Sequence, residues 1–221
     1  MPWLGYFYKI AHCDVFVILD NVDFQQGNHN SITNRTKIKC NGEEKFFTIC
    51  VKKNHESKLI MDISIDKQAT NIKKQLKTIL FNYPKADYFK EFYPQLETQI
   101  NEALQQDSLS ELNIAMIKFI CELLQIKTPI VKASELDLKA DDRNERIVEI
   151  CKSLNGDVYF SGNGGKKYHD EALFISNGIN IKYTDFKPVE YKQVGDVFLP
   201  GLSILDVLMN CGIQQTINFI K

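Results

Sequence analysis

Blocks of apolar residues alternate with polar segments along the chain, and their spacing predicts strands and helices in alternation at both ends. Trp3–His12 has apolar residues at helical spacing, and Val15–Leu19 is a continuous apolar run typical of a strand buried on both faces. Val158–Phe160 and Ile179–Tyr183 are further strand candidates, separated by a helix that runs to about Ser176. This alternation predicts an α/β fold with a Rossmann-like, mainly parallel sheet.

The middle of the chain predicts a hairpin followed by helices. Thr36–Lys39 and Phe46–Val51 flank an Asn-Gly turn at 41–42, which favours a β-hairpin. The pattern is mostly helical from about residue 67 to 126. We therefore expect a single domain over residues 1–221, with a mostly helical insertion at about 67–126 that forms a helical subdomain.

Local signals complete the predicted order of elements. Ser108 and Glu111 form a capping box ahead of a long apolar helix, and Asp141 is placed to cap another helix. The remaining candidates are short strands at Ile63–Ile65 and Thr128–Ala133, and helices at about Lys67–Tyr83, Asp141–Leu154 and Leu202–Asn210.

The composition is that of a globular protein without a strong overall charge. Of the 221 residues, 44% are hydrophobic and 25% are charged, and the formal net charge is −1. A globally basic nucleic-acid-binding surface is therefore excluded. The segment Arg35–Lys90 holds 13 basic against 6 acidic residues. On charge alone this favours a solvated lysine surface over a binding patch. No apolar stretch reaches membrane-spanning length.

Six cysteines are scattered through the chain, without a Cys-x-x-Cys pair or a histidine partner at metal-ligand spacing. Most lie in apolar runs, which is typical of small core residues in a reducing compartment. The sequence therefore predicts neither a disulfide framework nor a metal site. We expect a soluble, cytoplasmic protein.

The glycine-rich turn after Val158–Phe160 is the strongest chemical signal. A strand, glycines, lysines and a helix follow each other in the order that lets backbone N–H groups hold an anion. The spacing matches neither a Walker A loop nor G-x-G-x-x-G, and a plain flexible turn is the alternative interpretation. His169, which opens the next predicted helix, could face the same pocket. The candidate phosphate- or substrate-binding residues are Ser161, Gly162, Gly164, Gly165, Lys166 and Tyr168.

Polar residues also follow the first buried strand, where open α/β sheets place their ligand chemistry. The candidate catalytic residues here are His29, Asp23 and Asp20. His29 titrates near neutrality in a polar loop, so it is the best-placed general base among the four histidines. Asn34 and Arg35 could bind sugar hydroxyls and carboxylate or phosphate oxygens. Alternatively, the Asn and Asp residues simply make turns.

A third signal lies near the C-terminus, in Leu202–Asp206. Ser203 is placed to cap a helix with Asp206 in its first turn, and this structural interpretation is the stronger one. It does not exclude Asp206 from a substrate-binding site.

Taken together, these blocks resemble the WbqC-like protein family. The matching segments are Pro2–Phe7, Asp14–Phe24, Asn34–Lys39, Tyr159–Tyr168 and Leu202–Asp206. Their order and spacing fit the family over nearly the whole chain. Family members usually begin with a strand and a Gln-Pro-x-Tyr-x-Pro segment, and this chain begins inside that segment. The resemblance therefore implies one strand fewer here than in the family.

The resemblance implies a function in the synthesis of O-antigen or another surface polysaccharide, since family members typically lie in such gene clusters. Members have been proposed to transfer an aminoacyl group, glycine in particular, to an amino sugar. We therefore expect an enzyme, an N-acyl or aminoacyl transferase, that acts on a nucleotide-linked amino sugar. The cofactor is unknown, and an activated acyl donor fits this chemistry. A homo-oligomer is compatible with the sequence.

Two other functions stay open. The segment around Trp3 and Tyr6 also resembles nucleotidylyltransferases of the HxGH type, but these two residues stand where that class has histidines. A nucleotide-dependent ligase or nucleotidyltransferase would consume ATP. A non-catalytic sugar-nucleotide-binding protein would bind its ligand without turnover.

Overall fold

The first helix and the strand after it form where the apolar pattern places them. The computed structural model describes every residue except 26–30 and 54–56. α1 (Leu4–Ala11) buries an apolar face, and β1 (Phe16–Ile18) pairs in parallel with β4 (Ile130–Lys132). A parallel pair needs a long crossover connection, which the hairpin and helices between these strands supply.

The predicted hairpin forms, and its second strand begins earlier than expected. β2 (Arg35–Cys40) and β3 (Glu43–Thr48) are antiparallel. Asn41 and Gly42 have positive φ angles of 51° and 81°, as this tight turn requires. Because the two-residue turn fixes the register, pairing starts directly after Gly42 rather than at Phe46, where the apolar run begins.

An asparagine divides the region predicted as one helix from about Lys67. α2 (Lys67–Thr70) and α3 (Ile72–Asn82) meet at Asn71, whose φ of 42° is left-handed and whose side chain caps α3. Asparagine tolerates this conformation because its short polar side chain bonds to nearby backbone. Upstream lies a 3₁₀ helix, η1 (Ile60–Asp62), and the predicted strand at Ile63–Ile65 forms only isolated bridges.

Two long helices and the C-terminal helix pack together. α4 (Phe89–Ala103) contacts both α5 (Leu109–Leu123) and α8 (Ile204–Ile220). Ser108 caps α5 as the capping box predicts. Gly212 has a φ of 73°, which kinks α8 near its middle. None of the helices in the described ranges is long and apolar enough to cross a membrane.

A second parallel pair lies in the C-terminal third of the chain. α6 (Arg143–Ser153) leads into β5 (Val158–Ser161), which pairs in parallel with β6 (Asn180–Tyr183). The N-cap of α6 is Asp142, whose side chain accepts two amide hydrogen bonds, rather than the expected Asp141.

The glycine turn opens a short 3₁₀ helix instead of the predicted α-helix. η3 (Asn163–Lys167) begins after Gly162, and α7 (Glu171–Ser176) begins separately. Glycine has a low helix propensity, so the helix does not start in the turn. It starts at Asp170, whose side chain accepts a hydrogen bond from the Leu173 amide.

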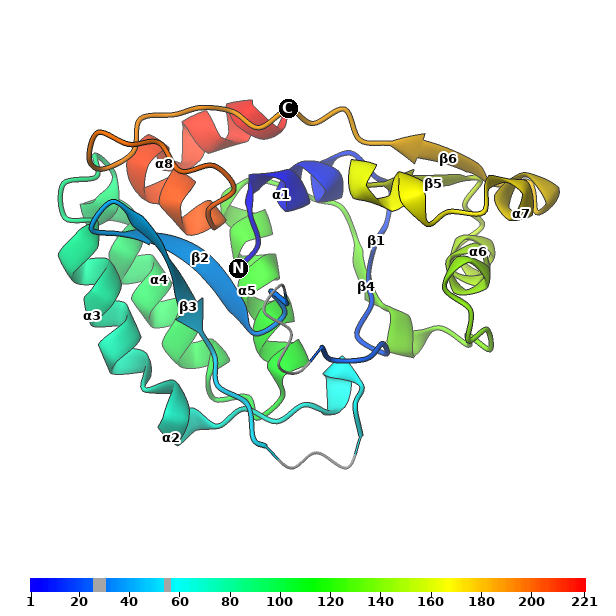
Figure 1. The fold of residues 1–221 in the computed structure, drawn as a ribbon, viewed down its shortest axis with the longest axis horizontal. Coiled ribbons are helices and arrows are strands. Elements are labelled where there is room, and N and C mark those ends of the chain that lie inside the picture. The colour runs from blue at the N-terminus through cyan, green and yellow to red at the C-terminus, as the bar shows by residue number, and fades with distance from the viewer. Residues whose placement is uncertain (26–30, 54–56) are drawn as a thin grey trace.

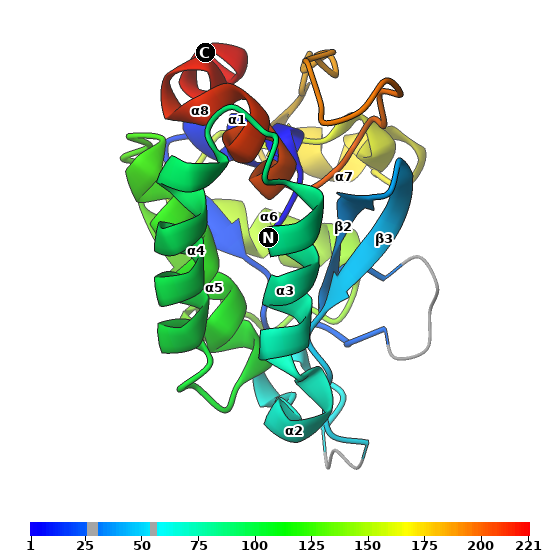
Figure 2. The same cartoon turned by 90° about the vertical axis from the view of Figure 1, so that its left-hand side faces the viewer.

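The elements gather in two groups around α1 and the β1–β4 pair. Figure 1 shows α2 to α5, α8 and the hairpin on one side, and α6, α7, β5 and β6 on the other. In Figure 2, α3, α4 and α5 lie side by side below α8. The main apolar core draws residues from both ends of the chain, among them Leu4 and Ile220. A smaller cluster includes Ile147 of α6, Phe174 of α7 and Ile179, which precedes β6.

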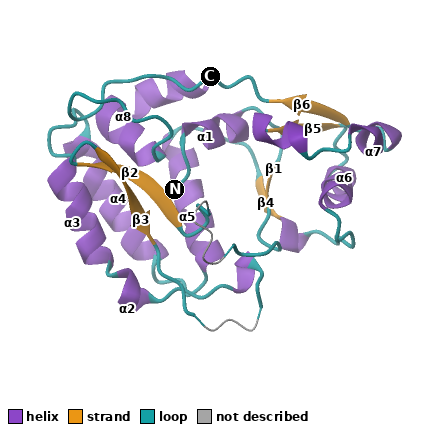
Figure 3. Ribbon diagram, in the orientation of Figure 1, coloured by secondary structure: helices purple, strands orange, loops and turns teal. Residues whose placement is uncertain are grey.

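The parallel strands do not join into one sheet within the described part of the chain. They form separate two-stranded sheets, β1–β4 and β5–β6, beside the antiparallel β2–β3 hairpin. Figure 3 shows how short the strands are beside the helices. The mixed α/β class is confirmed, but a single mainly parallel sheet is not seen. Apolar runs indicate that a strand is buried, and they do not say which strands are neighbours.

Candidate functional site

The turn after β5 depends on a glycine that the neighbouring side chains approach closely. Ser161 ends β5 and is 3% exposed, and Gly162 precedes η3. A Cβ on Gly165 would lie 2.5 Å from Cε1 of His169 and 2.7 Å from Oγ of Ser161. Gly164, in contrast, faces open space. The turn therefore brings Ser161 and His169 against the same stretch of backbone.

Aromatic side chains hold His169 in place. Its Nδ1 lies 3.1 Å from the hydroxyl of Tyr183, and the two rings are stacked with their centres 5.7 Å apart. The rings of Tyr159 and Phe174 contact it at centre distances of 5.4 and 5.9 Å. His169 is thus fixed by β5, α7 and β6, as a binding or proton-transfer role requires.

Cationic side chains surround this turn. Nζ of Lys166 lies 4.9 Å from the ring centre of Tyr183, and Nζ of Lys9 in α1 lies 5.8 Å from that of Tyr159. The guanidinium of Arg143 approaches from α6. We define the glycine-turn site as Lys9, Arg143, Ser161, Gly165, Lys166 and His169.

The first turn of α6 links the glycine turn to the end of β1. The Arg143 guanidinium lies 5.3 Å from the ring centre of Tyr168, which is 60% exposed. Nδ2 of Asn144 donates to the carbonyl of Tyr168 at 3.2 Å, and Arg146 donates to the carbonyl of Asn21 at 3.1 Å. One helix end therefore positions both segments.

The glycine-turn site combines positive charge with a neutral imidazole. Among the described residues, Lys9, Arg143 and Lys166 make no ion pair. Burial lowers the pKa of His169, and the charges of Arg143 and Lys9 lower it further, against the opposing effect of Glu171. These effects favour the uncharged form of His169 at neutral pH. The arrangement can bind an anion and accept a proton.

The candidate catalytic residues at the end of β1 have different surroundings. Asp20 is 2% exposed, and its carboxylate accepts hydrogen bonds from the amide and hydroxyl of Ser134 at 2.9 and 2.6 Å. These bonds tie β1 to η2 (Ala133–Glu135). Asp23 is exposed. His29 lies outside the described residues. Of the two carboxylates placed here, only Asp23 faces solvent.

Asn34 and Arg35 support the hairpin. Nδ2 of Asn34 donates to the carbonyl of Ile49 at 3.0 Å, which closes the open end of the hairpin. Nε of Arg35 donates to the carbonyl of Ser31 at 2.8 Å, and its guanidinium lies 4.2 Å from the ring centre of Phe46. The structure thus gives both residues a local role at the start of β2.

Asp206 lies inside a buried polar network. It is 0% exposed, and its two oxygens accept hydrogen bonds of 2.8 Å from the hydroxyls of Tyr83 and Tyr191. Asn210 donates to it at 3.3 Å, and the backbone amide of Lys39 donates to the Tyr83 hydroxyl at 2.7 Å. Burial raises the pKa of the Asp206 carboxyl, against these hydrogen bonds and the charge of Lys39. Asp206 therefore joins elements of the fold rather than facing a cavity.

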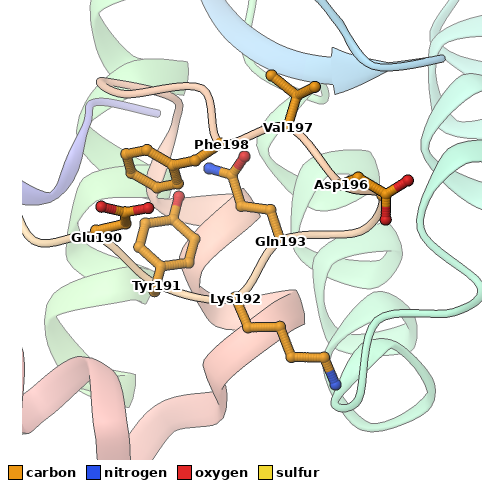
Figure 4. A pocket seen from close by; sticks show the side chains of 8 residues that line it. Glu190, Tyr191, Lys192, Gln193, Asp196, Val197 and Phe198 are labelled. Atoms are coloured by element: carbon orange, nitrogen blue, oxygen red, sulfur yellow. The ribbon is translucent and has the colours of Figure 1, made fainter.

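The long segment between β6 and α8 encloses a shallow cavity of about 350 Å³. Figure 4 shows the rings of Tyr191 and Phe198 close together, with Lys192 extending away from them. Gln193 holds the segment closed, because its amide exchanges two hydrogen bonds with the backbone of Leu199. The Nζ of buried Lys39 donates to Gln193 at 3.3 Å. The charged groups of the glycine-turn site are not part of this cavity's lining.

Lys9 and Arg143 are not among the site residues that the sequence predicts, and His169 is predicted only as a neighbour of the turn. A lysine in the last turn of a helix is ordinarily a complement to the helix dipole, so Lys9 carries no motif. Arg143 follows an acidic pair and has the appearance of a solvated helix start. Within the described ranges, no three His, Cys, Asp or Glu side chains are arranged to hold a metal ion.

Fold and site together define a mixed α/β protein with a cation-lined glycine turn at the carboxyl end of a parallel strand. The chain belongs to the WbqC-like protein family, whose model matches residues 1–218, and this confirms the resemblance seen in the sequence. An uncharacterized protein of Mycobacterium tuberculosis (strain ATCC 25618 / H37Rv), Rv1507c, is 31% identical over 217 residues, covering 97% of this chain and 91% of that protein. No solved structure matches the chain.

Proposed function

We propose that this protein transfers an acyl group of the aminoacyl type, such as glycyl, to the amino group of a nucleotide-linked amino sugar. The pathway we infer, from the gene clusters in which WbqC-like proteins typically lie, is the synthesis of O-antigen or another cell-surface polysaccharide. The observation that carries the proposal is the glycine-turn site, where Lys9, Arg143 and Lys166 have no acidic partner among the described residues. Unpaired cations around a glycine turn suit a diphosphate.

The position of the site supports the same ligand class. In open α/β sheets, ligands bind beyond the carboxyl ends of parallel strands, and the glycine turn directly follows β5 at that end. In the proposed complex, Lys166 and the backbone of Gly162 and Gly164 contact the phosphates, and Gly165, whose amide donates to the carbonyl of Gly162 at 3.0 Å, shapes the turn. Tyr168 lies beside them as an exposed ring.

The proposed chemistry needs a base for the attacking amine. The sugar nitrogen attacks the acyl carbonyl carbon, a C–N bond forms, and the bond to the leaving group of the acyl donor breaks. The amine proton goes to a base, a role we assign to His29 or Asp23. Asn34 and Arg35 would orient the sugar or the acyl donor.

Mass spectrometry tests the proposed reaction directly. The protein is incubated with an amino-sugar nucleotide and a panel of activated acyl donors, with and without ATP. We expect the nucleotide sugar to gain the mass of one acyl group, less the hydrogen it replaces, without ATP hydrolysis. Binding of the nucleotide sugar without any mass gain would overturn the transferase and indicate a binding protein. A mass gain that requires ATP cleavage would indicate a ligase instead.

A further inference from the structure

Lys9 has surroundings that packing alone does not explain. Its ammonium nitrogen lies near the rings of Phe16 in β1 and Tyr159 in β5, 5.9 and 5.8 Å from their centres. Within the described part of the chain it has no hydrogen-bond acceptor and no carboxylate partner. Burial lowers its pKa. A partly buried ammonium without an acceptor costs free energy, so an apolar side chain would pack here at less cost.

His169 also contacts Tyr159 and has a related environment. Its ring contacts Tyr159 and Tyr183, and it lies within reach of the positive charges of Lys9 and Arg143. The site therefore holds two nitrogen groups, on Lys9 and His169, whose charged forms the free protein disfavours. An anion bound between them would reverse that preference.

We propose that Lys9 and His169 form the inner wall of the phosphate site. When the diphosphate of a nucleotide sugar binds there, the His169 ring takes up a proton. The inference rests on the proposed function for the class of ligand. It goes further by naming the residues that hold the ligand and by coupling binding to uptake of one proton.

The charges around the site favour an anion. Lys9, Arg143 and Lys166 are cations, and the charge of Glu171 opposes them at His169. The positive charge of the site therefore suits the negatively charged diphosphate of a nucleotide sugar. Asp170, the chain neighbour of His169, is engaged as the N-cap of α7. The groups that face His169 come from α1, β5, η3, α6, α7 and β6: Lys9, Tyr159, Gly165, Arg143, Glu171, Phe174 and Tyr183.

The coupling predicts a pH dependence with a definite sign. The pKa of His169 in the free protein lies below its ordinary value of 6.5, and the bound dianion raises it. Between these two pKa values binding takes up a proton, so affinity falls as pH rises through this window. Below the window the ring is charged in both the free and the bound protein, and above it the ring is neutral in both. Affinity therefore does not change with pH outside the window.

The test uses UDP-N-acetylglucosamine as the probe, because its diphosphate diester does not titrate between pH 5 and 8. Calorimetric titrations at several pH values in this range compare the wild-type chain with Lys9→Met and His169→Gln. Lys118→Met, which removes an exposed lysine of α5, is the matched control. Inorganic pyrophosphate serves as a second probe that lacks the nucleoside and sugar. Thermal denaturation of each variant without ligand measures its stability.

We expect Lys9→Met to bind the nucleotide sugar about tenfold more weakly, because a charged contact is lost. Its Tm should stay unchanged or rise, because a partly buried charge without a carboxylate partner is gone. His169→Gln should abolish the pH dependence, and Lys118→Met should behave like the wild type. Unchanged affinity in Lys9→Met, a fall in its Tm that accompanies weaker binding, or a pH dependence that persists in His169→Gln would each overturn the assignment.

Failure of this inference and failure of the proposed function are distinguishable. Binding that depends on Lys9 and His169 but leads to no acyl transfer leaves the inference intact and removes the transferase. A wild-type chain that gains acyl product in the mass assay but binds neither probe through Lys9 and His169 overturns the inference alone.

Discussion

Gly165 is the single residue on which the geometry of the glycine-turn site depends most directly. The ring of His169 and the hydroxyl of Ser161 both occupy space that a side chain at this position would need. The His169 ring cannot rotate away freely, because Tyr183, Tyr159 and Phe174 contact it. A methyl group here must therefore displace a side chain that is held from several directions.

Gly165→Ala should displace His169 and lower the free energy of unfolding by about 1–3 kcal/mol, the usual cost of overpacking. Gly164→Ala is the matched control, since nothing lies within 4 Å of its added Cβ. Urea denaturation of both variants measures the difference. Equal stabilities for the two variants would contradict the close approach at Gly165.

Lys166→Ala should weaken the binding of a nucleotide sugar, because Lys166 directly follows Gly164 and Gly165 and its ammonium group is removed. We expect a loss of about tenfold, the value of one charged contact. Lys167→Ala removes the neighbouring exposed lysine and should have a smaller effect. Unchanged affinity in Lys166→Ala, measured by calorimetry, would refute its role at the phosphates.

At the scale of elements, the first turn of α6 determines how the site is assembled. The sequence places the cap at Asp141, and the structure places it at Asp142, whose carboxylate accepts hydrogen bonds from the amides of Asn144 and Glu145. These hydrogen bonds lower the pKa of Asp142. The difference of one residue matters because it sets the directions of Arg143 and Asn144.

Asp142→Ala should lower Tm by a few degrees at neutral pH, and Asp141→Ala should leave it nearly unchanged. Because the folded-state pKa of Asp142 is lowered, its contribution is present above the ordinary carboxyl range and is lost as pH falls. The difference between the wild type and Asp142→Ala should therefore shrink in acid. Thermal denaturation at pH 7 and pH 3 checks both statements.

The elements show what a sequence can and cannot predict. The existence of α1, β1, α5 and β5 follows from apolar periodicity and from the Ser108 cap, because these signals are local. The break at Asn71 and the restart of the helix at Asp170 were not predicted, because single hydrogen-bonding side chains decided them. The glycine turn could be selected as a site because its residues are contiguous. Lys9 and Arg143 could not, because only the packing of α1 and α6 brings them there.

At the scale of the whole molecule, the Asp206 network joins parts of the chain that are distant in sequence. It connects Lys39 of β2, Tyr83 after α3, Tyr191 of the segment before α8, and Asp206 within α8. These groups are buried in the main core or against it. A buried carboxylate that accepts several hydrogen bonds leaves all its donors unpaired when it is removed.

Asp206→Ala should therefore lower the free energy of unfolding by about 3 kcal/mol or more, the range seen when one partner of a buried charged network is deleted. Tyr191→Phe removes one donor and leaves Tyr83 and Asn210 on the carboxylate, so it should cost about 1 kcal/mol. Asp196→Asn changes an exposed carboxyl of the same segment and should stay within about 0.5 kcal/mol of the wild type. Urea denaturation followed by tryptophan fluorescence suits this series, because Trp3 pairs with Ser203 at the start of α8. If Asp206→Ala lowers the free energy of unfolding no more than Asp196→Asn does, Asp206 does not hold these elements together. That result would favour a role for Asp206 in binding a ligand.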